Sequence, residues 1–223
     1  QLAFGGGTIA VTPLEIATAY ASFANGGFKI TPYLIERIDS GDQDAMIEAN
    51  PKRVCVNKCE DINAAPRIVE ERVAYIMNSI LADAISKGTG RKVMRAFKRS
   101  DIKGKTGTTN DADIWFSGYT TDIVATAWAG FSDNSPVGSR EFGSTTPIAI
   151  WIDFMDQVIQ PEKETTTLPT PDGLVTVRID RDTGLRADPQ DLEGEFEIFR
   201  TEYAPMEVIS DDTEMDQSLQ EIF

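Results

Sequence analysis

The chain has 223 residues, 41% of them hydrophobic, and a formal net charge of −15. This length and composition suffice for one sizeable hydrophobic core. The acidic balance argues against nucleic acid as a partner, because nucleic acid repels a negative surface. The sequence contains no histidine, which excludes a His-based catalytic triad and most catalytic zinc sites, so no metal and no cofactor is expected. No apolar run approaches the ~18 residues that span a bilayer.

The first predicted element is a helix over residues 14–24, where apolar side chains recur at helical spacing. Thr12, Pro13 and Glu15 form a capping-box pattern at its start. Asn25-Gly26-Gly27 predicts its end.

A strand is expected at residues 30–38, and the polar stretch 40–66 is expected to form a surface hairpin or loop. The two cysteines, Cys55 and Cys59, lie in this stretch. The first interpretation is a disulfide that closes a small loop, which fits an oxidising periplasm. The alternative is two reduced thiols in a cytosolic loop. A redox-active pair is disfavoured because the spacing is not Cys-x-x-Cys.

A second helix is predicted over residues 67–86 and is stopped by Lys87-Gly88-Thr89-Gly90. Its expected apolar stripe consists of Val69, Val73, Ile76, Met77, Ile80, Leu81 and Ile85. The basic segment 91–99 is expected to be a connecting loop, either solvated or at the rim of a cleft.

Gly104-Lys105-Thr106-Gly107-Thr108-Thr109-Asn110 is predicted to lie on a strand, before two aromatic-rich strands at residues 112–121 and 123–131. A further helix is expected at residues 148–159. Beyond it, the sequence predicts a linker, then a short strand at residues 174–179 and a turn at Asp182-Thr183-Gly184.

Several of these segments, taken in order, carry a resemblance to a known family. They are residues 12–27, Lys105-Thr106-Gly107, residues 115–120, residues 128–131 and residues 147–155. Lys-Thr-Gly on a strand is one of three signatures of the penicillin-recognising serine enzymes. The chain strongly resembles the C-terminal half of the transpeptidase domain of a class A penicillin-binding protein, the bifunctional peptidoglycan synthase.

The resemblance implies an α/β (α+β) fold, in which helices flank an antiparallel sheet that is incomplete in this chain. Residues 1–162 are expected to be the C-terminal part of the transpeptidase domain, and residues 163–223 a linker and extension.

The resemblance also implies roles for the residues of the Lys-Thr-Gly strand. Lys105 places a positive charge beside a nucleophilic serine, and the hydroxyls of Thr106 and Thr108 bind a substrate carboxylate. Gly107 lets a peptide lie against the strand, and the N–H of Thr108 is one oxyanion-hole donor.

Three further residues are expected near the bound substrate or β-lactam. Asn110 follows the strand, and Ser144 and Thr145 precede the helix at residues 148–159. The alternative for the Ser144 segment is a cap for that helix.

The family also requires a Ser-x-x-Lys nucleophile motif and a Ser-x-Asn motif, both before Lys-Thr-Gly. Ser100-Asp101-Ile102-Lys103 and Ser132-Asp133-Asn134 fit these patterns but are rejected. The first lies on the run-in to a strand, which cannot bring its serine and lysine around one carbonyl. The second is a surface turn after Lys-Thr-Gly. The nucleophile is therefore expected on a preceding, N-terminal part of the same protein.

The implied function is that of a peptidoglycan DD-transpeptidase, which cross-links stem peptides ending in D-Ala-D-Ala through a serine acyl-enzyme and is acylated by β-lactams. The resemblance places it at the periplasmic face of the bacterial inner membrane, with the anchor and a glycosyltransferase domain outside this chain. A non-catalytic binding or assembly module with a degenerate site is the alternative, and a serine β-lactamase is a weaker one.

Overall fold

The computed structural model describes most of the chain in two compact units, Gln1–Thr170 and Pro171–Phe223. The described residues are 10–40, 45–55, 63–109, 111–160, 167–188 and 193–206. The predicted domain boundary after residue 162 falls outside them and stays a prediction.

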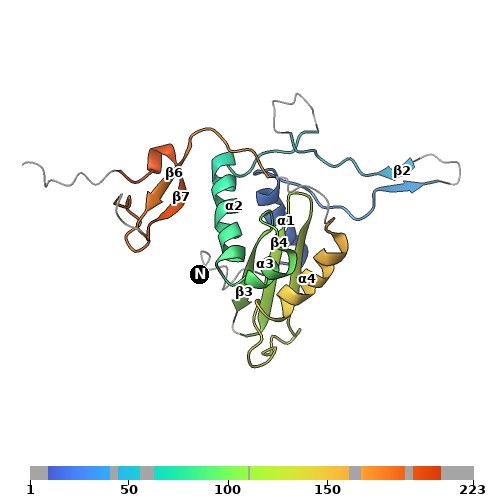
Figure 1. Ribbon diagram of the computed structural model, residues 1–223. Coiled ribbons are helices and arrows are strands. Elements are labelled where there is room, and N and C mark those ends of the chain that lie inside the picture. Colours follow the sequence, from blue (N-terminus) through green and yellow to red (C-terminus); the bar gives the residue numbers. More distant parts are fainter. Residues whose placement is uncertain are drawn as a thin grey trace, which may run out of the picture. The chain divides into compact units, whose positions relative to one another are not determined.

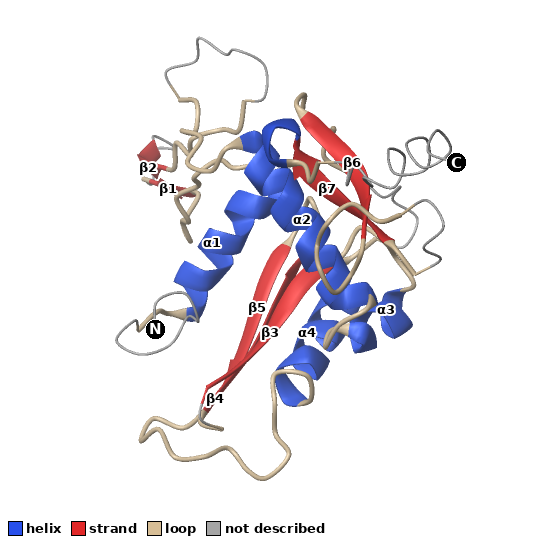
Figure 2. Ribbon diagram, turned by 90° about the vertical axis from the view of Figure 1, so that its left-hand side faces the viewer, coloured by secondary structure: helices blue, strands red, loops and turns tan. Residues whose placement is uncertain are grey.

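A three-stranded antiparallel sheet lies within the first unit (Figures 1 and 2). Its strands, in spatial order, are β3 (Lys103–Thr109), β4 (Asp113–Tyr119) and β5 (Val124–Ala129). The predicted Lys-Thr-Gly strand and the two aromatic-rich strands are confirmed. Helices flank this sheet, so the predicted α/β fold with an antiparallel sheet is confirmed as well.

Helices cover both faces of the sheet. They are α1 (Pro13–Ala24), α2 (Glu71–Ser86), α3 (Arg91–Phe97) and α4 (Thr146–Val158). Phe116 and Tyr119 point to opposite faces of β4, because side chains alternate along a strand. Tyr119 packs with α1 and α2, whereas Phe116 contacts Trp151 of α4 with ring centroids 5.1 Å apart. Figure 1 shows the sheet between α2 and α4.

The predicted capping box of the first helix is confirmed. The Thr12 hydroxyl accepts from the N–H of Glu15 at 3.2 Å, and the Glu15 carboxylate accepts from the N–H of Thr12 at 2.8 Å. These two bonds satisfy N–H groups that a helix start leaves without partners. Asn25 caps the other end, and Gly26 and Gly27 follow with φ of 83° and 107°.

The second helix departs from the sequence prediction in its start and in its buried face. It begins at Glu71 rather than Arg67, because the N–H groups of Ile68 and Val69 donate to the carbonyl of Gly27. The buried positions are Ala74, Asn78, Leu81 and Ile85. Val73 and Ile80 of the predicted stripe are 36% and 52% exposed, so that part of the prediction is wrong.

The strand predicted at residues 30–38 is mostly wrong. Only β1 (Arg37–Asp39) forms there, and it pairs with β2 (Ala45–Glu48) in an exposed hairpin. Pro32 cannot donate to a ladder, and Leu34 is 97% exposed. The prediction of a surface hairpin or loop in the following stretch is confirmed in the part that is described.

The basic segment 91–99 is not a connecting loop, because residues Arg91–Phe97 form α3. Gly90 occupies its N-cap position, and Val93 is fully buried against the core. Lys98 ends the helix in the left-handed conformation, with φ 52° and ψ 36°.

The second unit contains a two-stranded antiparallel sheet, β6 (Leu174–Ile179) and β7 (Glu195–Arg200), and a 3-10 turn, η2 (Thr201–Tyr203). The predicted strand and turn are confirmed, since the carboxylate of Asp180 accepts from the N–H of Thr183 at 2.7 Å and Gly184 follows with φ 69°. The partner strand β7 is a finding of the structure.

Candidate active site

The Lys-Thr-Gly residues lie on β3, which within the described residues is an edge strand of its sheet. Lys105 pairs with Ser117 of β4, and Thr106 pairs with Phe116. Lys105 therefore shares the sheet face of Ser117, whereas Thr106 and Thr108 share the Phe116 face toward α4.

The Lys105 side chain is exposed and turns back to its own strand. Its Nζ donates to the backbone carbonyl of Thr106 at 2.8 Å. That carbonyl is thus accessible at the edge of β3. Neighbouring residues of an antiparallel ladder alternate in the direction of their backbone groups, so the N–H of Thr108 points the same way as the groups of Thr106.

The Thr106 hydroxyl contacts a residue from outside the sheet. Thr89, in the connection between α2 and α3, places its hydroxyl oxygen 2.6 Å from that of Thr106. This contact brings the connection between α2 and α3 beside β3.

The Thr108 hydroxyl contacts the segment before α4. The N–H of Gly143 donates to it at 3.1 Å. Gly143 is buried, and a Cβ there would lie 2.3 Å from the carbonyl oxygen of Trp115 and 2.5 Å from that of Gly107. Glycine is therefore needed for this close approach.

One carboxylate holds the rest of that segment. Glu141 accepts from the hydroxyls of Thr145 at 2.9 Å and Thr146 at 2.5 Å. Both bonds lower the pKa of Glu141, and the bond from Thr146 has the larger effect. Thr145 occupies the N-cap position of α4 but makes no side-chain cap bond. Ser144 is half-buried beside it.

Two predicted residues, Asn110 and Cys59, lie outside the described part of the chain. Cys55 is disulfide-bonded, but its pairing with Cys59 stays a prediction.

Neither rejected serine motif has the geometry of a nucleophile site. Ser100 is exposed and lies after the end of α3, so no helical turn joins it to Lys103. Lys103 is half-buried and donates to the carbonyl of Asp101 at 3.2 Å, and burial lowers the pKa of its ammonium. Ser132 lies in an exposed turn, where the N–H of Asn134 donates to the carbonyl of Phe131.

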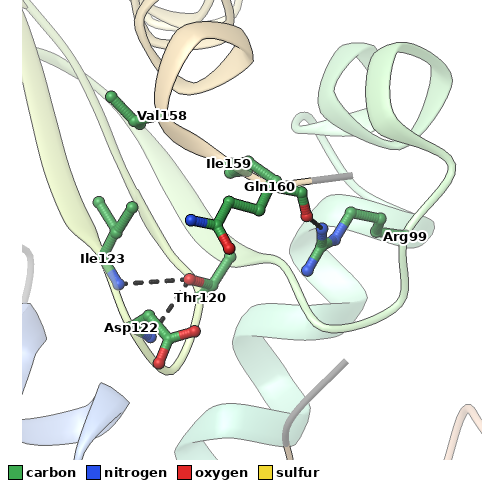
Figure 3. A pocket seen from close by; sticks show the side chains of 7 residues that line it. All are labelled: Arg99, Thr120, Asp122, Ile123, Val158, Ile159 and Gln160. Atoms are coloured by element: carbon green, nitrogen blue, oxygen red, sulfur yellow. Dashed lines mark hydrogen bonds between the residues drawn. The ribbon is translucent and has the colours of Figure 1, made fainter. Parts of the chain in front are cut away.

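A pocket of about 170 Å³ lies apart from these hydroxyls, at the turn between β4 and β5 and the end of α4 (Figure 3). It is lined by Arg99, Thr120, Asp122, Ile123, Val158, Ile159 and Gln160. Arg99 is engaged there by two bonds to the carboxylate of Asp101, at 2.9 and 2.7 Å, and one to the carbonyl of Gln160 at 3.2 Å. The charged wall residue Arg99 is thus held by Asp101, and the pocket is lined by none of the predicted site residues.

The described residues contain neither a membrane-spanning helix nor a cluster of metal ligands. None of the helices described is long and apolar enough to cross a bilayer. The described acidic and cysteine side chains form no cluster of three or more that could hold a metal ion.

The fold and the Lys-Thr-Gly edge define a class of protein that comparison with known families identifies. Residues 1–145 match the family model described as the penicillin binding protein transpeptidase domain, and the chain belongs to this family.

Among curated proteins, the chain is similar to penicillin-binding protein 1A of Pseudomonas aeruginosa, with 40% identity over 91% of this chain and 29% of that protein. Penicillin-binding protein 1A of Vibrio cholerae is 32% identical over 94% of this chain and 30% of its own length. The crystal structure of penicillin-binding protein 1A from Haemophilus influenzae matches with a TM-score of 0.80 and 34% identity, over 89% of this chain and 33% of that one. The chain thus spans about three tenths of the length of these curated relatives.

Proposed function

We propose that this chain forms the Lys-Thr-Gly wall of a peptidoglycan DD-transpeptidase site. A serine oxygen attacks the penultimate D-Ala carbonyl of a stem peptide, and the amide bond to the terminal D-Ala breaks. That D-Ala leaves as the free amine, and an amine of a neighbouring stem then attacks the acyl-enzyme and releases the serine. β-Lactams react as mimics of D-Ala-D-Ala and stop at the acyl stage.

The observation that carries the proposal is the edge position of β3, where one strand presents an ammonium, two hydroxyls and an open backbone. Thr106 and Thr108 lie on one face and donate to the substrate carboxylate, while Lys105 contributes its charge beside the serine. The N–H of Thr108 is the proposed oxyanion donor, and the ladder alternation described above supports its direction. Asn110, Ser144 and Thr145 are proposed as further contacts.

The nucleophile and its lysine are proposed to lie in the part of the protein that precedes this chain, together with the Ser-x-Asn motif. The parent protein is proposed to act at the periplasmic face of the inner membrane and to carry a glycosyltransferase domain. The chain covers only about three tenths of the length of its curated relatives, which supports a parent protein with further domains outside this chain.

The test is Lys105→Ala in the intact protein. The rate of acylation by benzylpenicillin, followed by intact mass spectrometry, is expected to fall at least ~100-fold, the scale of losing one strong transition-state contact. Lys87→Ala is the matched control, because Lys87 is an exposed lysine paired with Asp83 at the end of α2.

The position of the adduct separates the alternatives. An adduct on a serine outside this chain supports the proposal, whereas an adduct on Ser100 overturns the rejection of that motif. An intact protein that forms no adduct at all supports the non-catalytic binding module, and rapid turnover of the drug would favour a β-lactamase.

A further inference from the structure

The connection between α2 and α3 contains a threonine between two glycines, Gly88-Thr89-Gly90. The sequence alone predicts only the end of a helix there. In the structure, the hydroxyl oxygen of Thr89 lies 2.6 Å from that of Thr106 on β3. This hydrogen bond joins residues 17 positions apart.

The turn that carries Thr89 is tightly packed against the last turn of α2. The N–H of Gly88 donates to the carbonyl of Asp83 at 3.0 Å, and that of Gly90 donates to the carbonyl of Ala84 at 2.9 Å. A Cβ on Gly88 would lie 2.8 Å from the Ala84 oxygen, and one on Gly90 would lie 2.6 Å from the Ile85 side chain. Thr89 is therefore presented on backbone that has little room to move.

The chemistry of the hydroxyl group then determines which way this bond must run. A carboxylate is acceptor-only, so Thr106 can bind one only by donating its single O–H proton to it. Thr106 cannot donate the same proton to Thr89. The bond must therefore run from Thr89 to a lone pair of Thr106 whenever a carboxylate is bound.

We propose that Thr89 is a positioning residue for carboxylate binding, which orients the Thr106 hydroxyl so that its proton points to the ligand carboxylate. This inference rests on the proposed function of Thr106. Gly143 stands in the same relation to Thr108, because its N–H donates to the Thr108 oxygen at 3.1 Å and leaves that hydroxyl's proton free. Each of the two hydroxyls proposed to bind the carboxylate thus accepts a hydrogen bond from a residue outside its strand.

The test compares Thr89→Val with Thr89→Ser in the intact protein. Valine matches threonine in shape but has no hydroxyl. The rate at which benzylpenicillin acylates the Thr89→Val protein is expected to fall about tenfold, as for the loss of one hydrogen bond to a group that binds a charge. Serine keeps the hydroxyl and is expected to stay within about twofold of the parent. Thr89→Ala repeats the loss of the hydroxyl should valine perturb the turn.

Two further measurements separate positioning from a structural effect. The methyl ester of benzylpenicillin has no free carboxylate. It is expected to acylate the protein slowly, and at the same rate in the parent and in Thr89→Val. In the double variant with Thr106→Val, the Thr89→Val change is expected to have no additional effect, since coupled residues are not additive.

The outcomes are distinct. If Thr106→Val alone leaves acylation unchanged, the proposed role of Thr106 fails and this inference fails with it. If Thr106→Val lowers the rate but Thr89→Val does not, only the inference about Thr89 is overturned. It is also overturned if Thr89→Val slows the ester equally, or adds its full effect to Thr106→Val.

Discussion

Gly143 donates its backbone N–H to the hydroxyl of Thr108, 35 residues earlier in the chain, at 3.1 Å. This bond ties the segment before α4 to the far half of the Lys-Thr-Gly strand. It depends on the absence of a side chain at Gly143, because the carbonyl oxygens of Trp115 and Gly107 occupy the space that a Cβ would need.

Gly143→Ala is therefore expected to push the segment away from β3 and to release the Thr108 hydroxyl. We expect benzylpenicillin acylation of the intact protein to fall about tenfold, as for the loss of one hydrogen bond near a charged ligand. Gly138→Ala is the control, since it also adds a Cβ, at a residue with φ 135°, but its nearest neighbour would be the Glu141 side chain at 3.6 Å. Equal losses in the two variants would show that loop strain, and not the Thr108 contact, is responsible.

The buried ion pair of Arg99 and Asp101 predicts how the stability of the fold depends on pH. Asp101 is 2% exposed, and although burial raises the pKa of its carboxyl, the hydrogen bonds and charge of Arg99 outweigh that and leave it below the ordinary 3.8. A carboxyl with a lowered pKa stabilises the fold fully above pH 3.8 and loses this contribution as the pH falls through the lowered value.

Asp101→Asn is expected to lower the free energy of unfolding at pH 7 by roughly 3 kcal/mol, because it leaves a poorly exposed guanidinium without its charge partner. The difference from the parent protein should shrink as the pH approaches 3. Urea unfolding of the intact protein at both pH values measures this. Asp39→Asn, which breaks the exposed pair with Arg37, should cost under about 1 kcal/mol. An equal cost for the two variants would contradict the prediction.

Asn78 connects three elements through its buried side-chain amide. Its Nδ2 donates to the carbonyls of Phe23 and Ala74, each at 2.8 Å, and its Oδ1 accepts from the Tyr119 hydroxyl at 3.0 Å. It thereby links the end of α1 to α2 and β4.

Asn78→Leu is expected to destabilise the intact protein by roughly 3 kcal/mol, because the buried Tyr119 hydroxyl would lose its acceptor and the link between α1 and α2 would be broken. Thermal unfolding followed by circular dichroism measures this loss. Asn50→Ala, at the hydrogen-bonded surface residue Asn50, is the control and should change stability by under about 0.5 kcal/mol. A stable Asn78→Leu protein would show that apolar packing replaces the amide.

Local patterns in the sequence were sufficient wherever neighbouring residues decide the structure. The capping box at Thr12, the strand of Lys105 and the turn at Asp182 all depend on spacings of a few residues, and all are confirmed. Where chain-distant contacts decide, the sequence misleads. The backbone of residues 67–69 pairs with residues 27 and 28 instead of extending α2. The basic composition of residues 91–99 predicts a loop, but the burial of Val93 against the core stabilises a helix there.

The sequence by itself therefore determined the family and the strand on which the candidate site lies, because both rest on short motifs in a fixed order. Only the tertiary structure decided which residues contact the hydroxyls of that strand. Thr89 and Gly143 carry no catalytic motif, and their contacts with Thr106 and Thr108 arise because the segments that precede α3 and α4 reach the same strand. Glycines mark both places in the sequence, on either side of Thr89 and at Gly143 itself, since glycine removes the Cβ that would hold two backbones apart.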